Sequence, residues 1–173
     1  VHHGQGPDQD ADNPQQRKLL EEVREAVQQQ RMSLLFQPVV SLRGDTTERY
    51  EVLLRMRNRE GWELLPETVF GLVKRHRIGM VLDRWVIAHS IRVLRERRAR
   101  GRAAILFINI SPTILRDEEL FNWLQSGLSK TEVPASSLVF EIAETTAEIN
   151  KQTLLPFLKR IKELGCGISL DHF

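Results

Sequence analysis

Polar side chains lie in or directly after apolar runs of this sequence that otherwise have the pattern of buried β-strands. Taken singly, a buried Asn is most often a satisfied core group, and an acid at a strand end most often caps the next helix. Here the pattern recurs on four successive runs, at Glu51, Asn109, Glu141 and Asp171. Oxygen ligands of this kind suit a hard cation such as Mg²⁺ or Mn²⁺, and burying the carboxylates together without one would be costly. The recurrence favours one shared site over four separate structural roles.

The apolar run over 50–56 also supplies a group that could bind an anion. Side chains alternate along a strand, so Glu51, Leu53 and Arg55 share one face. A guanidinium is a two-pronged donor that suits a phosphate. For Glu51 and Arg55 taken alone, a structural ion pair is the preferred interpretation. The other polar strand ends shift the preference towards a ligand.

The elements that must position these side chains begin with a hairpin. Apolar runs over 34–40 and 50–56 are joined by a short turn-forming stretch, and strands so closely joined must be antiparallel. We then expect strands over 104–110, 137–143 and 167–170, and helices over 66–76, 80–100, 112–128 and 151–164. Strands that alternate with helices predict an α/β fold with a parallel sheet, in which ligands bind beyond the carboxyl ends of the strands.

The composition excludes several classes of protein. With 41% hydrophobic residues among 173, the chain has ample material for a folded domain, and no apolar run approaches the roughly 20 residues that cross a bilayer. We therefore expect no membrane insertion and a cytoplasmic location. Cys166 is the only cysteine, which excludes an internal disulfide and a thiolate zinc cluster and predicts a small core residue.

The two N-terminal segments have different characters. Residues 1–14 have almost nothing to bury and are expected to be a disordered lead or a remnant of cloning. Residues 15–30 have the apolar spacing of one amphipathic helix. This helix either caps the domain or ends a signalling helix from an upstream domain.

Positive charge is concentrated between residues 74 and 102. Ten Lys and Arg side chains stand there against two acids, with Trp85 as the one aromatic residue. A basic cluster can mark a nucleic-acid footprint, but this one lies in an expected amphipathic helix and has little aromatic interleaving. A solvated helix face is the preferred interpretation, and we expect no DNA partner.

Six motifs in order resemble the EAL domain family, the cyclic-di-GMP phosphodiesterases and receptors of bacterial signalling. They are Phe-Gln-Pro-Val-Val-Ser-Leu (36–42), Glu-Val-Leu-Leu-Arg (51–55), Asp-Arg-Trp-Val-Ile (83–87), Asn-Ile-Ser (109–111), Glu-Ile-Ala-Glu (141–144) and Asp-His-Phe (171–173). The resemblance implies a TIM-like (β/α)₈ barrel with an antiparallel first strand. Such a barrel needs about 250 residues. We therefore expect residues 31–173 to be an EAL domain truncated after its fifth strand.

The resemblance also implies roles for individual residues. In active members the metal ligands would be Glu51, Asn109, Glu141 and Asp171. Gln37 and Arg55 would contact the guanine and phosphate of the dinucleotide, Leu53 would line the base pocket, and Asp83 is a further expected nucleotide contact. The implied ligand-binding set is thus Gln37, Glu51, Leu53, Arg55, Asp83 and Asn109. Glu144 would support a loop beside the site.

Three positions depart from the family's pattern. Val52 replaces the signature Ala, which is a mild change, and Ala143 stands where a Thr is usual. His172 replaces a second Asp, and neutral imidazole is a poorer ligand for Mg²⁺ than a carboxylate. These departures favour a degenerate, FimX-like receptor that binds cyclic di-GMP and relays the signal to a protein partner such as a PilZ-type adaptor. Its Mg²⁺ or Mn²⁺ would be either kept or lost.

Two alternatives stay open. One is an active metal-dependent phosphodiesterase that produces linear pGpG, in which Glu51 and Asp171 would act in catalysis. The other is a module that has lost its ligand and acts only through protein interactions.

Overall fold

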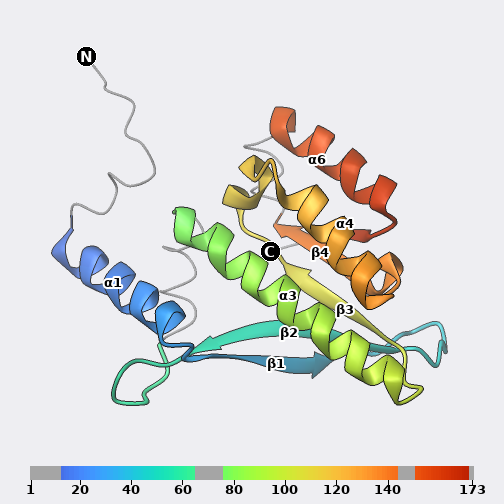
Figure 1. Cartoon of the computed structure of the whole chain (residues 1–173), viewed down its shortest axis with the longest axis horizontal. Coiled ribbons are helices and arrows are strands. Elements are labelled where there is room, and N and C mark those ends of the chain that lie inside the picture. Colours follow the sequence, from blue (N-terminus) through green and yellow to red (C-terminus); the bar gives the residue numbers. More distant parts are fainter. Residues whose placement is uncertain (1–12, 65–75, 144–150, 172–173) are drawn as a thin grey trace.

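The computed structural model describes residues 13–64, 76–143 and 151–171 (Figure 1). Its strands are β1 (Met32–Pro38), β2 (Glu48–Met56), β3 (Ala104–Asn109), β4 (Leu138–Ala143) and β5 (Gly167–Asp171). Its α-helices are α1 (Pro14–Gln28), α3 (Arg77–Ala99), α4 (Leu120–Thr131) and α6 (Lys151–Leu164), with short 3₁₀ turns η2 (Pro112–Arg116) and η3 (Ala135–Ser137).

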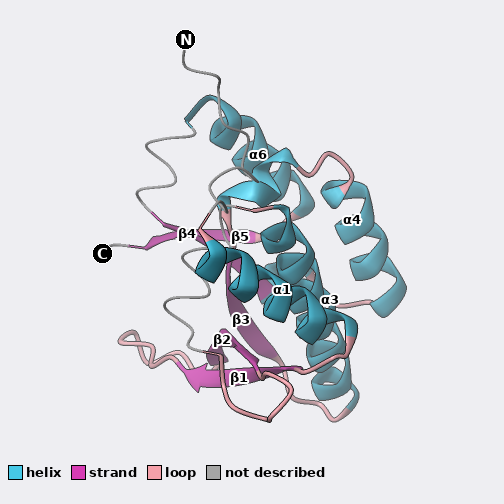
Figure 2. Ribbon diagram, turned by 90° about the vertical axis from the view of Figure 1, so that its left-hand side faces the viewer, coloured by secondary structure: helices cyan, strands magenta, loops and turns pink. Residues whose placement is uncertain are grey.

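The five strands form one sheet in the order β1-β2-β3-β4-β5. β1 pairs with β2 antiparallel, whereas β2, β3, β4 and β5 pair in parallel, each joined to the next through helical segments. Figure 2 shows the helices gathered on one side of this curved sheet. The topology confirms the predicted α/β fold and its antiparallel first strand.

The main core lies between the sheet and α3, α4 and α6. Alternate strand residues point towards these helices, so Leu106 and Ile108 of β3 are fully buried together with Ile87 of α3 and Leu124 of α4. Cys166 is buried in the same core, as predicted, and burial raises the pKa of its thiol to about 11. The sheet is therefore covered on its helix-facing side by packed apolar side chains.

A second, smaller core holds α1 against the end of the hairpin. Asn13 caps this helix by accepting a hydrogen bond from the Gln15 N–H, and Pro14 occupies the first turn, where a missing N–H costs nothing. Val23 and Ala26 are fully buried against the end of β2 and the start of α3. The helix predicted over 15–30 thus caps this end of the sheet.

Three predicted helices differ from the observed ones or lie largely outside the described residues. The helix expected over 112–128 is wrong as a single element, because the chain forms η2 and then α4, with Asp117 extended between them (φ −82°, ψ 92°). The reason is that Asp117 is held by an ion pair to Arg84 on α3. α3 begins three residues before its expected start. The helix expected over 66–76 falls outside the described residues except for His76, which precedes α3.

Within the described part of the chain, no helix is both long enough and apolar enough to cross a membrane.

Candidate functional site

The side of the sheet turned away from the helices, here called the open face, carries the predicted nucleotide-binding residues of the hairpin. In the antiparallel register Gln37 lies opposite Glu51, and Leu35 lies opposite Leu53. Residues directly opposite one another point to the same face. Exposure separates the two faces, since Leu35 is 50% exposed whereas Val52, which points to the helices, is 4% exposed. Gln37, Glu51 and Leu53 therefore share the open face.

The parallel strands bring the predicted oxygen ligands to the same face. Asn109 is in register with Glu141 of β4, and its Nδ2 donates a hydrogen bond to Oε1 of Glu51, 3.3 Å away. Glu141 is buried, at 8% exposure. Asp171 is paired with Ala143, two residues beyond Glu141 along the strand direction. Its side chain lies outside the described residues. The structure thus brings Glu51 and Asn109 into contact and places Glu141 beside them by register.

The described side chains do not make a cation site on their own. Carboxylate and amide oxygens are chemically suited to a hard cation. However, the described residues contain no group of three or more His, Cys, Asp or Glu side chains close enough to share an ion. Asn109 also directs its amide donor, not its carbonyl oxygen, at Glu51. Metal binding by the four predicted ligands stays a prediction.

Arg55 has a different partner from the one expected for it in isolation. Among the described residues, its Nε pairs with Oε1 of Glu63 at 3.2 Å, not with Glu51, and its Nη1 donates to the carbonyl of Leu54 at 3.2 Å. The side chains of Arg55 and Glu63 are 31% and 53% exposed. The guanidinium is therefore half-accessible and loosely held, and the structural pair with Glu51, preferred only for those two residues taken alone, is replaced by a pair with Glu63.

Sequence reasoning missed Glu63, although the chain carries a signal for it. After β2 the backbone turns over residues 58–62 and returns antiparallel, with Glu63 bridged to Arg57. Asn58 accepts the Trp62 N–H on its side chain, and Gly61 has a left-handed φ of +85° that favours glycine. An Asn and a Gly at this spacing indicate a tight turn, which would have returned Glu63 to the open face.

Asp83 is engaged inside the protein. Its Oδ2 accepts hydrogen bonds from the backbone N–H of Ser111, at 2.8 Å, and from the Ser111 hydroxyl. Asp83 is 8% exposed and Ser111 is 2% exposed. This contact holds the segment that directly follows Asn109. Direct contact between Asp83 and a nucleotide stays a prediction.

The neighbouring Arg84 makes a two-bond ion pair with the same part of the chain. Its Nε and Nη2 each lie 2.6 Å from one carboxylate oxygen of Asp117, a two-bond geometry, and its guanidinium lies over the Trp123 ring. The hydrogen bond to Asp117 is the main reason that the pKa of Arg84 is raised. Asp83 and Arg84 together fasten α3 to the segment between β3 and α4.

The positions that depart from the family's pattern lie in different surroundings. Val52 is packed in the main core, so its larger side chain bears on packing and not on the open face. Ala143 is half-buried opposite Asp171 at the end of β4. Glu144 and His172 lie outside the described residues.

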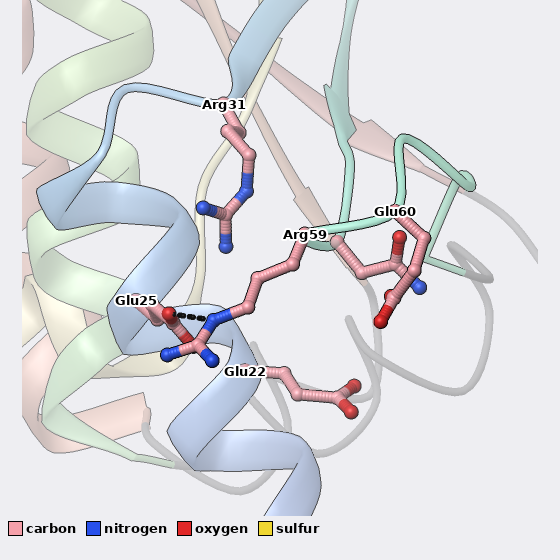
Figure 3. A pocket seen from close by; sticks show the side chains of 6 residues that line it. Glu22, Glu25, Arg31, Arg59 and Glu60 are labelled. Carbon is pink, nitrogen blue, oxygen red and sulfur yellow. Dashed lines mark hydrogen bonds and ion pairs between the residues drawn. The ribbon is translucent and has the colours of Figure 1, made fainter.

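A separate pocket of about 230 Å³ lies between α1 and the turn that follows β2 (Figure 3). Figure 3 shows Arg59 reaching from the turn to Glu25 on α1, with which it forms an ion pair. None of the residues predicted from the sequence lines it; its lining residues are Glu22, Glu25, Arg31, Asn58, Arg59 and Glu60. This pocket is therefore distinct from the open face.

Solved structures with the same fold include two of FimX. The FimX EAL domain is 36% identical, with a TM-score of 0.83, and the match covers 90% of this chain and 62% of that one. The FimX EAL domain from Pseudomonas aeruginosa, solved bound to c-di-GMP, is 34% identical with a TM-score of 0.81 and the same coverage. The chain thus spans less than two thirds of these domains.

Sequence relatives include the cyclic di-GMP phosphodiesterase PdeF of Escherichia coli K12. It is 28% identical over 155 residues, which are 90% of this chain and 20% of PdeF. The model of the EAL domain family matches residues 20–173, so it includes the sheet, the open face and most of α1. With this match and the similarity to the FimX EAL domain, the predicted α/β barrel fold is confirmed over about five strands, and the chain belongs to the EAL domain family.

Proposed function

We propose that this chain binds cyclic di-GMP on its open face and acts as a receptor that relays the signal to a protein partner. The main support is the β1–β2 hairpin, which carries Gln37, Glu51 and Leu53 on one accessible face beside the loosely held Arg55. A guanidinium with free N–H donors next to an apolar side chain suits a phosphodiester attached to a purine base. The FimX EAL domain bound to c-di-GMP supports the same ligand.

The proposal favours a receptor over an enzyme because of the residues around the metal position. His172 and Ala143 replace the carboxylate and hydroxyl residues usual in the family. A Mg²⁺ or Mn²⁺ ion would be held by Glu51, Asn109, Glu141 and Asp171, and its chemistry would be to activate a water molecule. We propose that nucleotide binding is retained while this activation is lost. A PilZ-type adaptor is the proposed kind of partner.

The second candidate is an active phosphodiesterase that produces pGpG. It is favoured by the contact between Asn109 and Glu51 and by the register that sets Glu141 beside Asn109, because this arrangement preserves the expected ligand order. Its relationship to proteins such as PdeF points the same way. Glu51 and Asp171 would then take part in catalysis.

Calorimetric titration of the full-length protein with cyclic di-GMP, with and without Mg²⁺, tests the proposal. We expect saturable binding, and we expect no pGpG in a parallel product assay with Mn²⁺. Formation of pGpG that is abolished by Glu51→Ala would support the second candidate instead. If no binding occurs under either metal condition, the receptor proposal is wrong.

A further inference from the structure

Glu63 lies on the open face because of the way the chain turns after β2. The Leu64 N–H donates to the Met56 carbonyl at 2.9 Å, and the Asn58 N–H donates to the Trp62 carbonyl at 2.9 Å. These bonds bridge Arg57 and Glu63 in antiparallel pairing. Bridged residues point to one face, and residues two apart on a strand do as well. Glu63 therefore joins Arg57 and Arg55 on the face that also carries Leu53.

On that face, the Glu63 carboxylate occupies one edge of the Arg55 guanidinium, which is the predicted phosphate-binding group. Its Oε1 lies 3.2 Å from Nε of Arg55, and Nη1 of the same guanidinium is turned to the Leu54 carbonyl. The carboxylate neutralises the one arginine that the proposed function assigns to a phosphate. An incoming phosphodiester anion would meet Glu63 as a like charge a few ångströms away, in addition to Glu51 on the same strand face.

We propose that Glu63 acts as an electrostatic gate on Arg55. In the ligand-free protein their ion pair closes the gate. When cyclic di-GMP binds, its phosphodiester displaces the Glu63 carboxylate from Arg55 or shares the guanidinium with it. This inference rests on the proposed function and adds a residue that sets its affinity. The pair is suited to such an exchange, since a single 3.2 Å contact between half-exposed groups contributes little to stability. A gate of this kind lowers the affinity for the phosphodiester.

The Glu63→Gln variant distinguishes a gate from a residue that only orients Arg55. Glutamine keeps the length of the side chain and an oxygen that accepts from Nε, but it removes the negative charge. If Glu63 served only to orient Arg55, the Glu63→Gln protein would bind cyclic di-GMP with the wild-type affinity or more weakly. If Glu63 acts as a gate, removing its charge should tighten cyclic di-GMP binding about fivefold at low ionic strength. This factor is the effect of one charge contact in water at about 4 Å. This gain should shrink in 0.5 M salt, since salt screens exposed charges.

The first experiment needs no nucleotide. Arginine Nε–Hε signals of the ¹⁵N-labelled full-length protein are recorded by NMR, and Arg55 is assigned with Arg55→Lys. We expect the Arg55 signal to move in Glu63→Gln and to stay in place in Glu60→Gln. Glu60 is the matched control, because it lies in the same turn but lines the pocket beside α1 (Figure 3). An Arg55 signal that is identical in wild type and Glu63→Gln would overturn the ion pair, and with it the gate.

The second experiment titrates the same proteins with cyclic di-GMP in calorimetry. About fivefold tighter binding by Glu63→Gln, with Glu60→Gln equal to wild type, supports the gate. Equal or weaker binding by Glu63→Gln overturns the gate while wild-type binding still supports the proposed function. Absence of binding in every protein, wild type included, contradicts the proposed function itself and removes the basis of the gate.

Discussion

Two arginines in this chain each face a carboxylate, and the two pairs differ in their bond geometry and in the burial of the carboxylate. Arg84 makes two 2.6 Å bonds to Asp117, whose side chain is 6% exposed, and it also lies over the Trp123 ring. Arg55 makes one 3.2 Å contact with Glu63, whose side chain is 53% exposed. Asp117 lies 33 positions after Arg84 in the sequence, whereas Glu63 is brought back to Arg55 by a turn.

The difference shows how the same chemistry serves structure in one place and binding in another. A pair with two short bonds and a buried carboxylate holds the guanidinium in one orientation and fixes the segment between β3 and α4 to α3. A pair with one longer contact leaves donors in solvent and costs little to open. We infer that Arg84 holds the scaffold of the open face and that Arg55 is available for binding.

The largest expected effect is on the structural pair. Asp117→Ala should lower the free energy of unfolding by about 3 kcal/mol, because it leaves the Arg84 guanidinium partly buried without its partner. Chemical denaturation followed by circular dichroism measures the change. Glu118→Ala is the control, since Glu118 is exposed and adjacent, and it should stay within about 0.5 kcal/mol of wild type. Equal destabilisation by both changes would remove the distinction between the two arginine pairs.

A smaller loss of stability is expected at Asp83. Asp83→Ala leaves the buried N–H and hydroxyl of Ser111 without this acceptor, which should cost about 2 kcal/mol. Asp83→Asn keeps an acceptor oxygen and should cost about half as much. Thermal unfolding of the three proteins compares them. If Asp83→Ala melts with wild type while nucleotide affinity falls, Asp83 acts on the ligand and not on the scaffold.

Arg55→Ala should lower the affinity for cyclic di-GMP and leave stability almost unchanged, unlike the two substitutions above. We expect stability within about 0.5 kcal/mol of wild type, because the pair with Glu63 is half-exposed. We expect cyclic di-GMP affinity to fall by about tenfold or more, the effect of losing a charge-assisted hydrogen bond. Calorimetry of Arg55→Ala beside Arg59→Ala, an exposed arginine at the pocket of Figure 3, measures the difference. Equal affinities in the two variants would show that Arg55 does not bind the nucleotide.

Much of the fold could be predicted from local pattern. The short connection between the first two strands required antiparallel pairing, and apolar runs alternating with helical periodicity predicted the parallel strands that follow. Alternation along β2 was enough to assign Glu51 and Arg55 to one face. These features depend on neighbours in sequence, which is why they were accessible before the structure.

The features that were missed depend on contacts between distant residues. The break between η2 and α4 follows from Asp117 reaching Arg84, a partner 33 positions away. The partner of Arg55 follows from the turn at Gly61, which returns Glu63 to the open face. Periodicity carries no information on such contacts, so the sequence offered Glu51 and not Glu63 as the neighbouring carboxylate for Arg55.

A titration of the ¹⁵N-labelled full-length protein with cyclic di-GMP, followed through assigned arginine Nε–Hε signals, tests the central claim most directly. The account predicts that the Arg55 signal moves saturably with the nucleotide while the Arg84 signal stays in place. A saturable shift of Arg84 with Arg55 unchanged, or no shift of either signal at saturating nucleotide, would contradict binding of cyclic di-GMP on the open face.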